Sequence, residues 1–228
     1  SQFFFTDPYD LTVLRPEDII FTNTLSPFTN LSYYKTFDSR NGEERFKSYF
    51  AINANKRFGV GFYIDYLYGR GLYASQSTAF FNGGLFASYR GDKYNMHFIF
   101  NNDNLKRAEN GGIADDRYIT NPLDMAEGKK EYKSYDIPTN LNKVWNHNTS
   151  YHVFMTQRYN LGFHKEKTDS VTKDSVRIIQ EFVPVTSFIH TLQVDLNGRK
   201  YISYDDEQNQ KYFEHNYLGN DSIDKTRR

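Results

Sequence analysis

Cysteine is absent from the 228-residue chain, which excludes disulfides, thiol catalysis and thiolate metal sites together. Long apolar runs are lacking too: mean hydropathy is -0.75, and no segment approaches the roughly 18 apolar residues that a transmembrane helix requires. Net charge is zero, with 28 basic and 28 acidic residues, and no basic cluster is interleaved with aromatic residues. A helical membrane protein is therefore excluded, and nucleic-acid binding has no support.

Aromatic residues are abundant, with 19 Tyr and 20 Phe making up most of an 18% aromatic fraction, and such residues suit a pleated sheet. In residues 45–69, "RFKSYFAINANKRFGVGFYIDYLYG", they recur at every second position on both sides of Lys56 and Arg57. This period predicts a β-hairpin with a tight turn, because the same residues would spread around a helix. Each arm has about 10 residues, which matches the roughly 9–11 residues of a membrane-spanning strand.

Alternation divides the hairpin into two faces. The apolar set is predicted to face lipid and comprises Phe50, Ile52, Phe58, Val60, Phe62 and Ile64. The mixed set is predicted to face an aqueous or protein-filled interior and comprises Lys47, Tyr49, Asn53, Tyr63 and Asp65, joined by Asn95 and His97 from a later strand. Tyr66 and Tyr68 are expected at the aromatic girdle of the outer interface. Arg in place of Phe62 is then expected to oppose assembly, and Arg in place of Tyr63 to be tolerated. A soluble sandwich that buries the aromatic face is the alternative.

Further strands are predicted at 29–37, 77–89, 94–102, 148–162 and 176–196. The connections between them alternate in length: tight turns at 56–57 and 90–93 separate longer links at 38–44, 70–76 and about 103–147. A loop of about 45 residues is unusual in a compact soluble domain. The alternation predicts an all-β fold, a transmembrane antiparallel β-barrel with long external loops and short periplasmic turns. The junction after residue 163 departs from it, because about a dozen charged residues stand where a short periplasmic turn is expected.

Several segments carry a family resemblance, among them "GFYIDYLYGRGLYASQST", "ASYRGDKYNMHFIFNNDNLKRAENGGIADDRYIT" and "FVPVTSFIHTLQVD". They resemble the putative porins of Bacteroidota outer membranes, over about residues 9–204. The resemblance implies a bacterial outer-membrane barrel with passive or substrate-linked diffusion across it. Because chains of that family are longer, we expect an N-terminal part of a longer protein. Residues 1–28 would form an N-terminal segment, and residues 29–228 would supply about seven or eight strands of one barrel domain.

No catalytic or metal-binding constellation is evident. The six His are scattered, and "GVG" at 59–61 lacks the rest of a dinucleotide fingerprint, so these glycines are better explained by crowding neighbours in a strand. We therefore expect no enzyme, no metal and no cofactor. Asp followed by Ser and a small apolar residue is the type of triplet that is O-glycosylated in Bacteroidota, which makes Ser170, Ser175 and Ser222 candidate modification sites.

Two functions remain open. The first is a porin-like barrel for passive diffusion of small solutes, with selectivity set by lumen side chains and by a loop folded inward, such as 103–147. The second is a plugged barrel that anchors a surface lipoprotein or a secretion complex; a soluble β-sandwich binding module is a lesser alternative. The expected partners are outer-membrane lipid, small solutes, and a second copy or an outer-membrane lipoprotein, with no nucleic acid.

Overall fold

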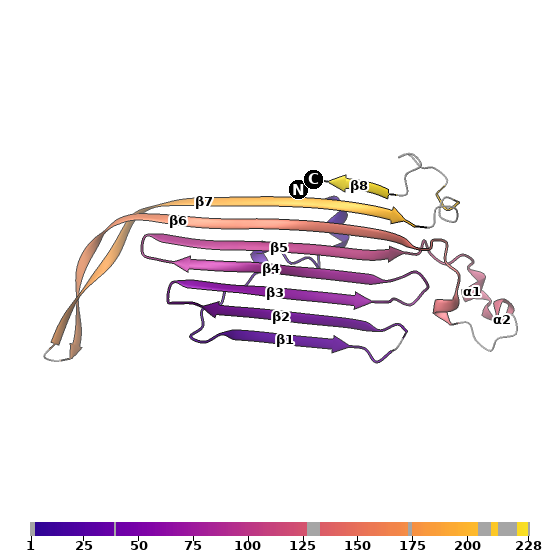
Figure 1. The fold of residues 1–228 in the computed structure, drawn as a ribbon, viewed down its shortest axis with the longest axis horizontal. Coiled ribbons are helices and arrows are strands. Elements are labelled where there is room, and N and C mark those ends of the chain that lie inside the picture. Colours follow the sequence, from indigo (N-terminus) through magenta and orange to yellow (C-terminus); the bar gives the residue numbers. More distant parts are fainter. Residues whose placement is uncertain are drawn as a thin grey trace.

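The computed structural model describes residues 3–38, 40–126, 133–172, 175–204, 211–213 and 223–227. For residues 167–172, 175–179 and 223–227 it describes the backbone alone. Eight strands form one antiparallel sheet in which each strand pairs with the next one along the chain (Figure 1). The strands are β1 (Phe28–Lys35), β2 (Glu43–Asn53), β3 (Phe58–Gly69), β4 (Thr78–Arg90), β5 (Tyr94–Glu109), β6 (Val144–Thr172), β7 (Ser175–Ser203) and β8 (Ile223–Arg227). The predicted all-β antiparallel class is confirmed.

Helical structure is short and lies outside the sheet. The N-terminal segment contains η1 (Phe4–Tyr9) and η2 (Pro16–Asp18), and the connection between β5 and β6 contains α1 (Arg117–Thr120), α2 (Pro122–Met125) and η3 (Ser134–Asp136). Among the described residues, no helix has the length and apolar character needed to cross a membrane.

The predicted hairpin at 45–69 forms as β2 and β3, which pair from Glu43 opposite Gly69 to Asn53 opposite Gly59. Its turn is closed by Asn55, whose side-chain oxygen accepts hydrogen bonds from the backbone N–H groups of Arg57 (2.8 Å) and Phe58 (2.9 Å). An Asn that bonds to its own following backbone stabilises a tight turn. The Arg57 guanidinium also contacts the Asp92 carboxylate at 3.0 Å, which links this turn to the tight turn between β4 and β5.

The predicted loop at 103–147 was too long. Strand β5 continues to Glu109 and β6 begins at Val144, and these two residues are directly paired. The added stretch is mostly polar, yet its backbone groups are satisfied by the neighbouring strands, so side-chain polarity does not end the strand. The connection is therefore confined to residues 110–143.

The predicted long turn after residue 163 was wrong, because the charged residues continue β6. Strands β6 and β7 have 29 residues each, and their pairing extends to Thr172 opposite Ser175. Lys165 lies opposite Glu181, so charges that suggested a loop form a cross-strand pair of opposite sign. The junction between β6 and β7 is thus short, and the apparent exception to the alternation of long and short connections disappears.

The hairpin of β6 and β7 projects beyond the rest of the sheet (Figure 1). Strand β5 begins at Tyr94, which pairs with Tyr159, so the ribbon beyond Tyr159 has no third strand beside it. The hairpin extends past the end of the sheet that carries the tight turns, whereas α1 and α2 lie at the opposite end with the longer connections.

Candidate functional site

The two predicted sets of side chains lie on opposite faces of the sheet. Tyr49 is directly opposite Tyr63, Lys47 is opposite Asp65, and the same parity continues through β4 to His97 and Asn95 on β5. We call the face that carries Tyr49 and Tyr63 the polar face, and the face that carries Phe50 and Phe62 the apolar face. All seven predicted lumen residues are on the polar face, and all six predicted lipid-facing residues are on the apolar face. Which solvent each face meets stays a prediction.

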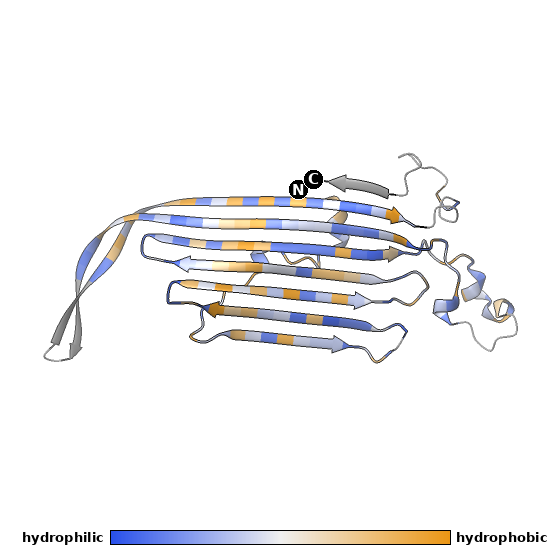
Figure 2. Ribbon diagram, in the orientation of Figure 1, coloured by the Kyte–Doolittle hydropathy of each residue, from blue (hydrophilic) through white to orange (hydrophobic). Residues whose placement is uncertain are grey.

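The apolar face carries a continuous band across six strands. Two rows of directly paired residues run from β2 to β7 without a polar side chain: Ile52, Val60, Ala87, Phe98, Met155 and Leu192 in one, and Phe50, Phe62, Leu85, Phe100, Val153 and Val194 in the other. Figure 2 shows hydrophobic residues along the middle of β5 and β6 and hydrophilic residues toward their ends. Leu85 is 55% exposed and Val194 42% exposed, so no other described part of the chain covers this band.

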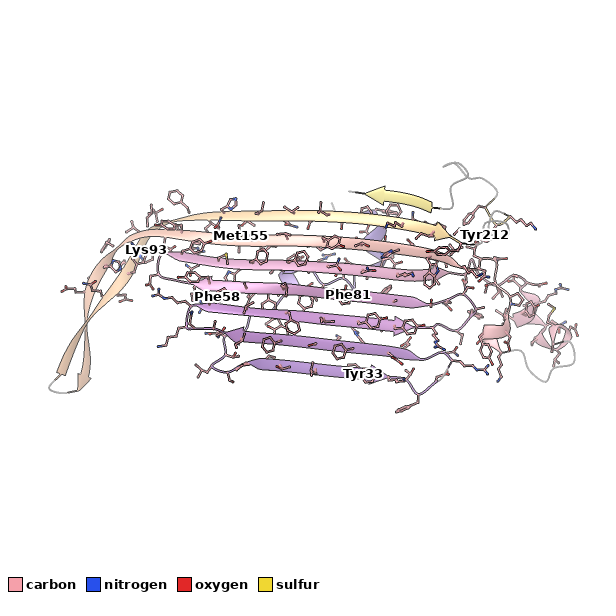
Figure 3. The ribbon with its side chains drawn as sticks, in the orientation of Figure 1. Tyr33, Phe58, Phe81, Lys93, Met155 and Tyr212 are labelled. Carbon is pink, nitrogen blue, oxygen red and sulfur yellow. The ribbon has the colours of Figure 1, made fainter. Side chains whose placement is uncertain are left out.

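Aromatic residues border the band on both sides. Tyr33, Phe46, Tyr66 and Phe81 form a directly paired row toward the long connections, and Phe58 pairs with Tyr89 toward the tight turns. Figure 3 shows Tyr33 and Phe81 displaced from Phe58 toward the long-connection end of the sheet. Phe58 and Tyr66 are eight residues apart on β3, which corresponds to about 27 Å along the strand. Tyr68, the second residue predicted at a girdle, follows on the same face.

The polar face is covered by the N-terminal segment, residues 3–27. Leu14, Ile19 and Phe21 pack against buried side chains of the strands, which include Tyr63, Phe86 and Ile99. The Phe21 ring is 5.4 Å from the Phe86 ring and 5.0 Å from the His97 ring, and Tyr9 packs on Phe80 and Leu105 in a second cluster. Gly61 has no side chain where the Phe86 ring lies, and an added Cβ would collide with that ring. The crowding inferred for this glycine is confirmed.

Hydrogen bonds from the strands fasten the segment's backbone. Such bonds satisfy the carbonyl groups of a segment that has no strand partner of its own. The Asn82 amide donates to the Thr12 carbonyl (3.1 Å), and the Asn101 amide donates to the Leu14 carbonyl (2.7 Å). The Tyr49 hydroxyl donates to the Ile20 carbonyl (2.7 Å), and the Asn53 amide donates to the Thr24 carbonyl (2.9 Å). The donors come from β2, β4 and β5, so the segment crosses several strands.

The connection predicted as the inward-folding loop lies elsewhere. Residues 110–143 contact the other long connections: the Asn142 amide oxygen is 3.1 Å from the Ser75 hydroxyl, and the Arg40 guanidinium lies 4.5 Å from the centre of the Tyr135 ring. The sequence did contain a signal for the N-terminal segment, since Leu14, Ile19 and Phe21 are apolar residues ahead of the first strand. Without the register of the sheet, that signal does not say which face they cover.

Charged side chains of the polar face form two clusters. Asp65 accepts two hydrogen bonds from the Arg45 guanidinium, at 2.9 and 2.7 Å, and its carboxylate is 3.5 Å from the Lys47 ammonium. In the second cluster His152 lies between two carboxylates, with Nδ1 2.6 Å from Asp195 and Nε2 3.4 Å from Asp103. Sequence reasoning did not select this second cluster, because Asp103 was assigned to a loop and β6 was not paired with β7.

Two of the three candidate modification sites lie at the end of the longest hairpin. The backbone of Ser170 belongs to β6 and that of Ser175 begins β7, but their side chains, like the whole of Ser222, lie outside the described residues. In the part of the chain that is described, His, Asp and Glu side chains form no group that could hold a metal ion.

The family model described as "Putative porin" matches residues 1–228. The chain belongs to this porin family. The resemblance found in the sequence is thereby confirmed at the level of the family, and the match includes the porin's N-terminal segment as well as its strands. No curated protein and no solved structure shows a significant match. For a porin, a polar face and an opposed apolar band are the two surfaces that a sheet needs to separate a lumen from lipid.

Proposed function

We propose that the chain forms part of an outer-membrane β-barrel through which small solutes diffuse passively, with the polar face lining the lumen. The observation that carries this proposal is the pair of uninterrupted apolar rows across β2 to β7. A soluble sandwich would place a second layer on these residues, and none of the described residues does so. A lipid bilayer covers such a band, and aromatic girdles border it in membrane barrels.

The connections agree with this arrangement. Tight turns lie at one end of the sheet and long connections at the other, as in barrels whose short turns are periplasmic (Figure 1). Closure requires the free edges of β1 and of β8 to pair with other strands, because an open edge leaves backbone groups unsatisfied in hydrocarbon.

The N-terminal segment bears directly on how wide the lumen is. Because it lies on the polar face, it would occupy part of the lumen and narrow the path of a solute. The same observation favours the second candidate function, a plugged barrel that serves as an anchor for a partner. The two candidates differ in whether any path remains beside the segment.

Planar-bilayer recording on the full-length protein separates these functions. We expect stepwise, voltage-independent conductance from the purified protein, and swelling of proteoliposomes in an isotonic solution of a small sugar. A matched preparation that was heat-unfolded before reconstitution is the control for detergent leakage. Complete absence of conductance and swelling from correctly folded barrels would contradict the pore and favour the anchor.

A further inference from the structure

A cavity of about 340 Å³ lies between the N-terminal segment and the strands β6 and β7. Segment residues between Phe3 and Glu17 form one wall, and residues of β6 and β7 that point to the polar face form the other. The cavity is therefore on the side of the sheet that the proposed function assigns to the lumen. Its volume is at the small end of the range for ligand pockets, which suits a solute of a few non-hydrogen atoms.

Carboxylates outnumber cations around this cavity. Asp7, Asp10 and Glu17 line it from the segment, and Asp195 lines it from β7. Arg15 contributes the guanidinium group of the lining. The Arg15 charge is engaged, because its guanidinium contacts Asp10 and lies 4.0 Å from Glu17. The Asp7 carboxylate has no partner in the described part of the chain, and Glu17 has only the distant contact to Arg15. Two carboxylates thus face the cavity with little local neutralisation.

One polar side chain of the cavity wall belongs to a buried residue and also has no hydrogen-bond partner in the described part of the chain. Ser150 lines the cavity and is only 2% exposed, and no described residue forms a hydrogen bond with its hydroxyl group. Asp103, which is paired with Ser150 across the sheet but does not line the cavity, is 1% exposed, and its Oδ1 has no partner among the described residues. Native proteins rarely leave buried polar groups unpaired. The Ser150 hydroxyl therefore points to a polar molecule that binds it from the cavity side.

His152 can neutralise only one of the two carboxylates that it contacts. Its two ring nitrogens contact Asp103 and Asp195, so one imidazole is shared by two carboxylates. Asp195 also accepts a hydrogen bond from Gln193 at 2.9 Å, which holds its carboxylate against the wall of the cavity. The electrostatic field inside the cavity is consequently negative, and a negatively charged cleft raises the local concentration of cations.

Apolar groups share the same cavity. Phe3, Val13 and Pro16 form part of the segment's wall. A short hydrocarbon chain packs against such side chains, whereas a bare metal ion gains nothing from them and prefers several oxygen ligands at one point. A molecule with a charged amino group on a short carbon chain fits both the carboxylates and the apolar wall.

We propose that this cavity binds small organic cations, such as aliphatic amines, and makes the pore favour cationic solutes over neutral and anionic ones. The proposal rests on the proposed pore function, since it names the class of solute that the lumen selects. The carboxylates of Asp7 and Glu17 attract the ammonium group, Ser150 accepts a hydrogen bond from it, and the apolar wall contacts the carbon chain.

Three four-carbon probes that differ only in their end groups test this selectivity: putrescine with two amines, 1,4-butanediol with two hydroxyls, and succinate with two carboxylates. Entry of each into proteoliposomes of the full-length protein is measured at low ionic strength. We expect putrescine to enter about tenfold faster than succinate, with butanediol between them. High salt should reduce the difference, because exposed charges are screened.

Matched variants then locate the effect. In the double variant Asp7→Asn, Glu17→Gln the ratio of putrescine entry to succinate entry should fall several-fold while butanediol entry stays the same. Asp195→Asn, on the opposite wall, should act in the same direction. Asp124→Asn in α2 removes a carboxylate far from the cavity and should change nothing. Gel mobility before and after heating shows whether each variant has folded.

The outcomes separate this inference from the pore itself. If all three probes cross at equal rates, or if the preference for putrescine survives in folded double and Asp195 variants, the cation site is overturned and the pore stands. If no probe enters liposomes that contain folded protein, the pore function fails first. A preference for putrescine that disappears in both sets of cavity variants and persists in Asp124→Asn supports the site.

Discussion

Consecutive residues of one strand have opposite surroundings, and the polar residue is the more deeply buried one. Phe62 is 36% exposed on the apolar face, whereas Tyr63 is 6% exposed on the polar face, under the N-terminal segment. The expectation that Arg in place of Tyr63 is tolerated is therefore wrong in its premise, because that position is not open to water. An Arg placed there would have to be desolvated beneath the N-terminal segment and would not fit the space of the Tyr63 ring, so we expect it to be destabilising.

A better pair for testing the two faces is Thr191 and Leu192 on β7, which are both exposed and point in opposite directions. Leu192 belongs to the apolar band, and an Arg on the lipid face near the middle of a bilayer costs about 2–4 kcal/mol. We expect Leu192→Arg to lower the yield of folded barrel sharply in vesicles, measured by urea unfolding or by heat-dependent gel mobility. Thr191→Arg should lose at most about 1 kcal/mol, from one exposed hydrogen bond to Thr156. Equal effects of the two variants would mean that the apolar band does not contact lipid.

At the scale of elements, the N-terminal segment and the sheet depend on each other. The segment has no strand pairing, so its position relies on apolar packing and on side-chain amides that donate to its carbonyl groups. These amides have few other partners, and the oxygens of Asn82 and Asn101 have none among the described residues. The segment is therefore bound to the polar face by contacts that are local and removable.

The double variant Asn82→Ala, Asn101→Ala removes two of these contacts, each worth about 1 kcal/mol. We expect the segment to become more sensitive to protease, and the single-channel conductance to rise or fluctuate as the segment leaves the polar face. Asn102→Ala is the matched control, because the Asn102 amide belongs to the same strand but donates to the Ser150 carbonyl from the apolar face. Conductance and cleavage identical to the unsubstituted protein in the double variant would show that these amides do not hold the segment.

At the scale of the whole molecule, the two ends of the sheet differ. One end carries the connection at 110–143 with α1 and α2, and the other carries the tight turns and the projecting hairpin of β6 and β7 (Figure 1). If tight turns are periplasmic, the hairpin projects into the periplasm and not from the cell surface. The accessibility of these two ends from outside the cell therefore reports the orientation of the protein in the membrane.

Epitope tags at the two ends measure that orientation. A tag inserted after Asn121, between α1 and α2, should bind antibody on intact cells. A tag in the hairpin beyond Leu161 should bind antibody only after the outer membrane has been permeabilised. Insertions at exposed tips with few contacts are tolerated best, so both tags should leave the fold intact. The reverse pattern of accessibility would invert the topology, with the projecting hairpin at the cell surface.

The local features of this protein follow from the amino-acid sequence alone. Side chains alternate with period 2 in any strand, so the opposite faces of Phe62 and Tyr63 follow from their positions alone. The turn at Asn55 to Arg57 also follows from nearby residues, because its hydrogen bonds are made within the turn. Family membership was visible in the same way, in contiguous segments of sequence.

Only the tertiary structure decided where strands end and what covers each face. The segments 103–109 and 164–172 are mostly polar, and they form strands because a neighbouring strand satisfies their backbone groups, which no local pattern reveals. The cluster of Asp103, His152 and Asp195 exists because three strands align in one register. The N-terminal segment covers the polar face because its apolar residues meet Phe86 and Ile99, which are distant in sequence and adjacent only after the sheet has formed.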